Sequence, residues 1–273
     1  MTSPPYTSVM VEANGLQHRV LQFGEPGAQD LLLLPGITMP ALGTAFIARA
    51  LTDRFRVSVP DLRGRGESDR APSGGYTLRD YAADADGVIE ALELTRPVVL
   101  GHSLGARIAA AHATLFDRSR IGAVVLVDPP TTGPGRPPYP TPRSSFVEQL
   151  AEARRGTTVE ELRTFYPRWP VAELELRVEL LPTCDEDAVM ESYTGFENED
   201  FLSLWEQLEQ PALLIRGSDS PVVTAADAEE LHRRNSAIPL AVVPAAGHMV
   251  PWDNLPGFLQ LLHEHLPLPS RRG

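Results

Sequence analysis

The sequence predicts an α/β fold in which helices cover both faces of a mostly parallel, twisted sheet. Short apolar runs alternate with longer helical patterns along most of the 273 residues. These runs are apolar at every position rather than at every second position, which is typical of strands buried on both faces. One long segment between two runs lacks a strand pattern, and there we expect an inserted helical region.

The N-terminal region is expected to form a hairpin, followed by six further strands. Residues 8–23 contain two strand-like runs around Asn14-Gly15, a dipeptide that tolerates the positive φ angles of a type I′ turn. The expected strands after it are residues 31–34, 57–59, 98–100, 123–127, 212–215 and 240–243. Because helical patterns separate most of them, these strands are expected to run parallel.

Helical patterns fill most of the gaps between the strands. They cover residues 41–52, 78–94, 104–116, 225–234 and 257–266. In the second of these helices, Thr77 stands at the N-cap position and Asp80 follows near the positive end of the helix dipole.

The alternation of strands and helices breaks once, between Val127 and Ala212. A Pro- and Gly-rich loop is followed there by helical patterns at residues 146–155, 159–165 and 174–180. We therefore predict that residues 131–207 form a helical cap, inserted after the sixth strand and packed over the carboxyl edge of the sheet. Residues 1–130 and 208–273 would form the core domain.

Composition argues against several classes of function. The formal net charge is −12 and the isoelectric point is near 5.0, so nucleic acid and anionic membranes would be repelled and are not expected as partners. All 24 basic residues are arginine, which excludes chemistry that needs a lysine Schiff base, including lysine-anchored pyridoxal phosphate.

Redox and targeting signals are sparse. Cys184 is the single cysteine, which fits a reducing compartment, and we expect it to be a small buried hydrophobe. The first residues show no basic and apolar signal segment, and no apolar run approaches the length of a membrane span. These features predict a cytoplasmic protein, either a monomer or a homodimer.

The strongest chemical signal is a G-x-S-x-G motif, Gly101-His102-Ser103-Leu104-Gly105, between an expected strand and an expected helix. A nucleophilic serine needs a sharp strand-to-helix turn, where flanking side chains would clash and glycine is required. The turn lifts the hydroxyl above the sheet and points the helix N-terminus at the reaction centre. Ser103 is therefore the predicted nucleophile.

Two backbone N–H groups are expected to hold the negative charge that develops during acyl transfer. One belongs to Leu104, directly after the nucleophile. The other should come from the loop after strand 31–34, where we expect the N–H of Ile37 to supply it.

His248 is the predicted general base, since it follows the last expected strand, where the chain order of such enzymes places the histidine. The acid has two candidates. Its usual position, three residues after Gly217, holds Ser220, and Asp219 comes one residue too early. Asp128, at the end of strand 123–127, is favoured over Asp219 because several enzymes of this architecture carry the acid one strand closer to the nucleophile.

With these motifs in place, the chain resembles the α/β-hydrolase superfamily and, within it, the N-formylmaleamate deformylases of bacterial nicotinate degradation. The stretches that carry the resemblance are LLPGIT (33–38), DLRGRGES (61–68), GHSLGAR (101–107), VLVDPPTTGPGRPPYP (125–140), LPTC (181–184) and AGHMVPWD (246–253). The resemblance implies an α/β-hydrolase fold with a cap, Asp128 as the acid, and no metal or organic cofactor. It also implies the hydrolysis of an N-formyl amide to formate and maleamate.

A substrate of this kind carries a carboxylate, so the resemblance further implies a cationic partner in the pocket. Arg107, on the helix after the nucleophile, and Arg136, in the loop after Asp128, are the two candidates. Tyr139 and Trp252 are expected as pocket walls.

Other functions remain open at this point. A carboxylesterase or an enol-lactonase would use the same residues, because specificity depends on the cap and the pocket. A ligand-binding protein that kept the fold without turnover is a third possibility. Dehalogenases and epoxide hydrolases are disfavoured, since both need an aspartate where Ser103 stands.

Overall fold

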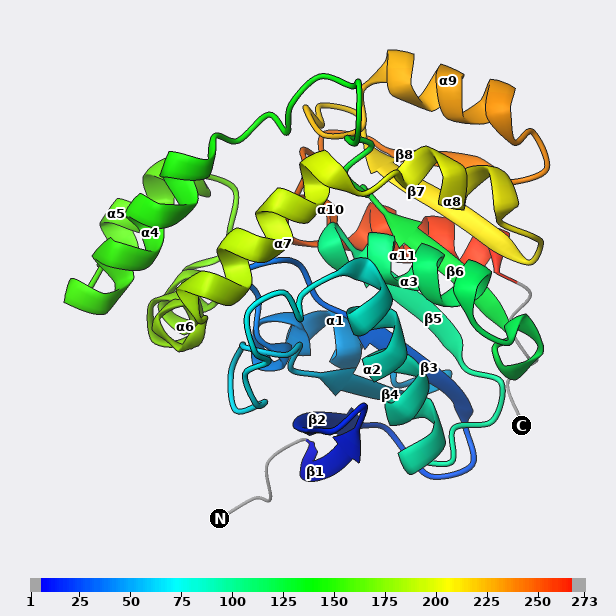
Figure 1. Cartoon of the computed structure of the whole chain (residues 1–273), viewed down its shortest axis with the longest axis horizontal. Helices are drawn as coiled ribbons and strands as arrows, with labels where there is room; N and C mark the ends of the chain where they lie inside the picture. Colours follow the sequence, from blue (N-terminus) through cyan, green and yellow to red (C-terminus); the bar gives the residue numbers. More distant parts are fainter. Residues whose placement is uncertain (1–5, 267–273) are drawn as a thin grey trace.

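The computed structural model describes residues 6–266, and its centre is an eight-stranded sheet (Figure 1). The strand order is β1-β2-β4-β3-β5-β6-β7-β8. β1 and β2 pair antiparallel, β2 also pairs antiparallel with β4, and all the remaining pairs are parallel. The strands are β1 Thr7–Ala13, β2 Leu16–Phe23, β3 Gln29–Leu34, β4 Phe55–Pro60, β5 Val98–His102, β6 Ala123–Val127, β7 Ala212–Gly217 and β8 Leu240–Val243. The expected α/β class and its mostly parallel sheet are confirmed.

The N-terminal hairpin turns at Asn14 and Gly15, as expected. Both residues have positive φ angles, 51° and 75°, which is the backbone that a type I′ turn requires. Ala13 and Leu16 pair across the turn, so the two-residue connection sets the register of β1 on β2.

Helices cover both faces of the sheet, and alternate side chains of each strand contact different helices. On β3, Leu32 and Leu34 pack in one cluster with residues of α2, α3 and α8 (Phe201–Gln207). Leu31 and Leu33 pack in another cluster with residues of α1 and α11. The helices of this core region are α1 Ala45–Leu51, α2 Leu78–Ala91, α3 Leu104–Leu115, α9 Ala225–Arg234, α10 Val250–Asp253 and α11 Leu255–His265, with short 3₁₀ turns η1 Ala41–Thr44 and η2 Arg118–Arg120. Burial on both faces explains why the strand sequences are apolar throughout.

The beginning of α2 shows how a short sequence signal sets a helix end. The Thr77 side chain accepts a hydrogen bond from the Asp80 N–H, and the Asp80 carboxylate accepts one from the Thr77 N–H. This reciprocal arrangement satisfies two N–H groups that the first turn leaves without partners.

Five α-helices lie between β6 and β7, where the inserted region was expected. They are α4 Arg143–Arg155, α5 Val159–Phe165, α6 Val171–Leu180, α7 Glu186–Asn198 and α8 Phe201–Gln207, with a 3₁₀ turn η3 Leu181–Thr183 after α6. Figure 1 shows α4, α5 and α6 projecting beyond the sheet, with α7 leading back towards it.

The last helix of the insertion belongs structurally with the sheet. α8 packs against α3, and its Phe201 and Trp205 are fully buried. It therefore lies inside the range 131–207 that we assign to the cap, yet it covers the sheet as a core helix does. Neither α7 nor α8 was expected, although Val189, Tyr193 and Phe196 of α7 recur at the i, i+4, i+7 spacing of a helix face.

Candidate active site

Ser103 occupies a sharp turn between β5 and α3. Its backbone has a φ of 55° and a ψ of −116°, a strained conformation for a residue with a side chain. The flanking glycines are required by close backbone contact: a Cβ on Gly101 would lie 2.0 Å from the Gly105 carbonyl oxygen, and one on Gly105 would lie 2.0 Å from the Leu34 carbonyl oxygen. This explains why the strand-to-helix turn carries glycine on both sides of the serine.

Three side chains from different elements form a row of hydrogen bonds at the carboxyl edge of the sheet. His248, in the loop after β8, places Nε2 3.0 Å from Ser103 Oγ and Nδ1 2.7 Å from an Asp128 carboxylate oxygen. Asp128 is fully buried at the end of β6. An Nδ1–H that donates to this carboxylate leaves Nε2 free to accept the serine proton.

The environment of Asp128 explains what Ser220 does at the position where an acid is usual. The Ser220 hydroxyl donates to the same carboxylate oxygen that contacts His248, at 2.5 Å, and the Gly217 N–H donates to the other oxygen at 3.4 Å. Ser220 thus supports a carboxylate that comes from the neighbouring strand.

Asp219 faces away from this row. Its exposed carboxylate lies 3.1 Å from an Arg168 nitrogen and accepts a hydrogen bond from Ser218. These two contacts, the Ser218 hydrogen bond first, hold the pKa of Asp219 below its usual range. Asp219 therefore contacts the cap rather than His248.

The loop after β3 brings Ile37 close to Ser103. A Cβ on Gly36 would lie 3.6 Å from the Ser103 Cβ, so the loop passes directly beside the nucleophile. Leu104 is the first residue of α3, where the N–H has no partner within the helix. The backbones of Leu104 and Ile37 therefore both lie near Ser103.

The DLRGRGES segment (61–68) forms hydrogen bonds with this loop and with the start of η1. Arg65, which is fully buried, donates from Nε to the Ile37 carbonyl oxygen at 3.0 Å. Asp61 accepts a hydrogen bond from the Ala41 N–H at 2.6 Å. Arg65 also donates to Ser192 of α7, so the same side chain links the loop to the inserted helices.

His102, inside the G-x-S-x-G motif, supports His248. Its Nε2 lies 2.9 Å from the His248 carbonyl oxygen. Burial in the first place, and then the nearby His248, lower the pKa of His102 to about 3, so the ring is neutral and can donate there from Nε2. Sequence reasoning assigned no role to His102, although its place beside the nucleophile could have drawn attention to it.

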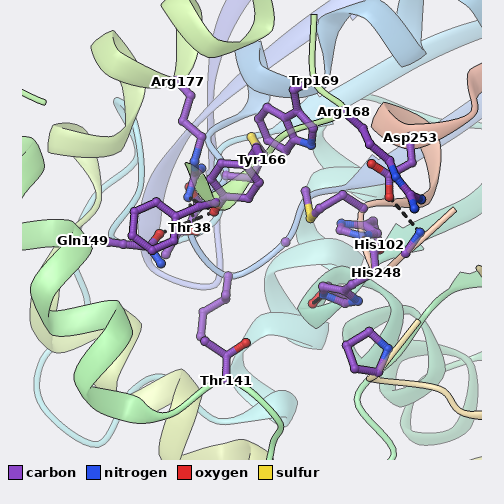
Figure 2. Close-up of a pocket in the computed structure, with 18 of the residues that line it drawn as sticks. Thr38, His102, Thr141, Gln149, Tyr166, Arg168, Trp169, Arg177, His248 and Asp253 are labelled. Carbon is purple, nitrogen blue, oxygen red and sulfur yellow. Dashed lines mark hydrogen bonds between the residues drawn. The ribbon is translucent and has the colours of Figure 1, made fainter. Parts of the chain in front are cut away.

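A cavity of about 460 Å³ opens over Ser103 and His248. Its core side includes Thr38, His102 and Asp253, and its cap side includes Gln149, Tyr166 and Arg177 (Figure 2). Two parts of the chain, the core and the inserted helices, therefore line one cavity.

Of the two expected aromatic walls, Tyr139 lines the cavity and Trp252 lies behind it. The Tyr139 hydroxyl is 3.4 Å from His248 Nε2, and burial raises the pKa of this phenol well above its usual value. Trp252 is stacked on Trp169 at a centroid distance of 5.2 Å, and of these two rings Trp169 is the one that reaches the cavity.

The two arginines expected to bind a carboxylate lie elsewhere. Arg107 belongs to α3 and is fully buried, and its guanidinium donates to backbone carbonyl oxygens of Pro130, Thr132 and Glu199. Arg136 is paired with two carboxylates of α9. Neither lines the cavity, so their placement corrects that expectation.

Two other arginines line the cavity instead, and sequence reasoning missed both. Arg168 follows α5 and contacts Asp219, and Arg177 projects from α6. In a sequence with so many arginines, only the packing of the inserted helices distinguishes these two.

No cluster of three or more potential metal ligands occurs within residues 6–266. None of the helices in that range is both long enough and apolar enough to span a bilayer. Cys184 is buried as expected, and burial raises the pKa of its thiol to about 11.

Comparison with known proteins gives close relatives over nearly the whole chain. N-formylmaleamate deformylase from Pseudomonas putida is 37% identical over 259 residues, which span 95% of this chain and 96% of that protein. A crystal structure of N-formylmaleamic acid deformylase from the same species has a TM-score of 0.88 at 37% identity, and the match covers 94% of this chain and 100% of that one.

A more distant relative is 2-(acetamidomethylene)succinate hydrolase from Mesorhizobium japonicum, which is 30% identical over 84% of this chain and 85% of its own length. The alpha/beta hydrolase fold family matches residues 31–255. By its sheet, its strand-to-helix serine turn and these matches, the chain belongs to the alpha/beta hydrolase family.

Proposed function

We propose that this hydrolase cleaves the C–N bond of N-formylmaleamate and releases formate and maleamate. The observation that carries the proposal is the unbroken row of hydrogen bonds from Asp128 through His248 to Ser103 at the floor of a cavity. The identity to a deformylase over nearly the whole chain supports the substrate. An amide-cleaving hydrolase as the second relative supports the bond type.

In the proposed first half-reaction, the Ser103 oxygen attacks the formyl carbon while His248 Nε2 takes the hydroxyl proton. The carbonyl oxygen becomes an oxyanion that accepts hydrogen bonds from the Leu104 and Ile37 N–H groups. His248 then gives its proton to the substrate nitrogen, the C–N bond breaks, and maleamate leaves.

In the second half-reaction, water attacks the formyl ester on Ser103. His248 takes a proton from this water, the ester bond breaks, and the proton returns to the serine oxygen as formate leaves. The departing nitrogen carries a second acyl group, which makes it a better leaving group than an amine. Ordinary serine-hydrolase machinery is therefore sufficient.

The proposal is tested by measuring formate release from N-formylmaleamate beside the hydrolysis of short p-nitrophenyl esters. We expect efficient formate release, poor ester turnover, and a loss of about 10⁴-fold or more in kcat for Ser103→Ala. Good ester turnover without formate would move the protein to the esterase alternative.

A non-catalytic binding protein is distinguished by a fluorophosphonate probe. A competent enzyme should be labelled in the wild-type protein and not in Ser103→Ala. Absence of both labelling and turnover, with a normal unfolding transition, would leave a ligand-binding role.

A further inference from the structure

Arg177 is a buried cation in the cap wall of the cavity. It projects from α6, and the whole residue is only about 4% exposed. Its terminal nitrogens donate to the Thr38 carbonyl oxygen, the Thr38 hydroxyl and the Tyr166 hydroxyl, each at 3.1 Å (Figure 2). The guanidinium also lies over the Tyr166 ring, 5.0 Å from its centroid, so its plane is held firmly.

The part of the chain that the structure describes places no carboxylate against Arg177. Over residues 6–266, Arg177 forms no ion pair with a carboxylate, its hydrogen-bond partners are neutral, and its buried Nε–H has no partner. Burying a charge without a counter-ion is unfavourable. A ligand that brings a negative charge into the cavity would remove this cost.

The other buried or cavity-lining arginines do not offer the same opportunity. Arg168 lines the cavity but already faces the Asp219 carboxylate at 3.1 Å. Arg107 is buried without an ion pair within the described residues, yet it lies outside the cavity and is close enough to Glu199 and Asp200 for their charges to act on it. Among the arginines that the structure describes, only Arg177 both lines the cavity and lacks a carboxylate partner.

We propose that Arg177 binds the carboxylate of the substrate and thereby selects anionic acyl compounds. This inference rests on the proposed function of the same cavity. Thr38, which accepts two of the Arg177 hydrogen bonds, follows Ile37 in the loop beside Ser103. A substrate with its formyl group at Ser103 can therefore direct its carboxylate to the cap wall, where a charge-assisted hydrogen bond forms.

The test compares two substrates that differ only in the group at the carboxylate position, which is charged in one and neutral in the other. One is N-formylmaleamate, and the other is the cis-N-formylcrotonamide in which a methyl group replaces the carboxylate. For Arg177→Met we expect kcat/KM on the anionic substrate to fall about 10- to 100-fold, mainly through KM, and kcat/KM on the neutral substrate to change less than about 3-fold. Arg177→Lys keeps a point charge and should lose less than Arg177→Met.

Arg136→Met is the matched control, since it removes a cap arginine whose partners are on α9 rather than in the cavity. It should leave both substrates unaffected. Equal losses on the two substrates in Arg177→Met would overturn the proposal, because they would show that Arg177 only positions the Thr38 loop.

A binding experiment separates this inference from the proposed function. Maleamate is titrated calorimetrically into Ser103→Ala and into Ser103→Ala/Arg177→Met, both checked by thermal unfolding. We expect the second variant to bind maleamate about 10- to 100-fold more weakly. If the wild-type enzyme releases no formate but this difference is found, the proposed reaction is wrong and the anion site stands. Equal binding by the two variants would overturn the anion site even where formate is released.

Discussion

The two walls of the cavity are built in different ways. The core wall includes Ser103, which follows β5, and His248, in the loop after β8, while Asp128 lies buried behind His248 at the end of β6. The hydrogen bonds of the sheet fix the spacing of these strands. The cap wall takes Arg177 and Tyr166 from inserted helices, whose positions depend on side-chain packing. The comparison teaches that the residues proposed for the reaction are fixed by the sheet, whereas the residue proposed for substrate recognition depends on helix packing.

Arginine side chains connect the two walls. Arg177 joins α6 to Thr38 of the core, and Arg168 joins the end of α5 to Asp219 and to the Ala245 carbonyl oxygen. The first link is buried and the second is exposed, so the second contributes little to stability. Because the proposed nucleophile, base and acid lie on the core side, a variant there should reduce kcat on every substrate. A variant at Arg177, on the cap side, should act mainly on KM for anionic substrates.

After Ser103→Ala, the largest expected effect is that of Asp128→Asn. An amide cannot supply the negative charge that orients and stabilises the protonated His248, so we expect kcat to fall about 10³- to 10⁴-fold. The loss should be equal on N-formylmaleamate and on its neutral analogue, which steady-state kinetics on both will show.

Asp219→Asn is the matched control for Asp128→Asn. It alters only exposed contacts, those with Arg168 and Ser218, so kcat should change less than about 3-fold. Comparable losses in the two variants, or a larger loss at Asp219, would contradict Asp128 as the acid.

An intermediate effect is expected for Ser220→Ala. Its hydroxyl donates to the Asp128 carboxylate at 2.5 Å, so its removal should lower kcat about 10-fold and leave KM unchanged. Ser220→Thr restores a hydroxyl and should recover part of the rate. If KM rises while kcat holds, or if Thr gives no recovery, Ser220 does not act through Asp128.

The core wall was more accessible to sequence analysis than the cap wall for a physical reason. Glycines at 101 and 105, required by backbone contact, and continuous apolar strands mark the sheet edge, and parallel pairing brings distant residues such as Ser103 and Asp128 together. The strands, the hairpin turn and the Thr77 cap are where the sequence predicted them. The structure brings the predicted nucleophile, base and acid into contact, while their catalytic roles stay predictions.

No comparable sequence pattern marks the residues of the cap wall. Arg177 reaches the cavity because α6 packs in one particular orientation, and that orientation depends on contacts that no local pattern encodes. Arg107 and Arg136 were expected in the pocket from their nearness in sequence to Ser103 and Asp128. Sequence nearness is a poor guide here, because side chains on α3 point to the sheet and to α8 as well as to the nucleophile.

The smallest expected effect apart from the Asp219 control is that of Tyr139, which tests where the boundary between the walls lies. Tyr139 belongs to the segment that leads from β6 into the cap, but its hydroxyl is 3.4 Å from His248 Nε2. This distance is long for a hydrogen bond, so Tyr139→Phe should lower kcat only about 3- to 10-fold. The ring stays packed against Phe196, 5.0 Å between centroids, so the fold should be retained. An equal loss on the anionic and neutral substrates would assign Tyr139 to the core chemistry. A loss confined to KM for the anion would place it with Arg177, and the division between the two walls would then fall at the end of β6.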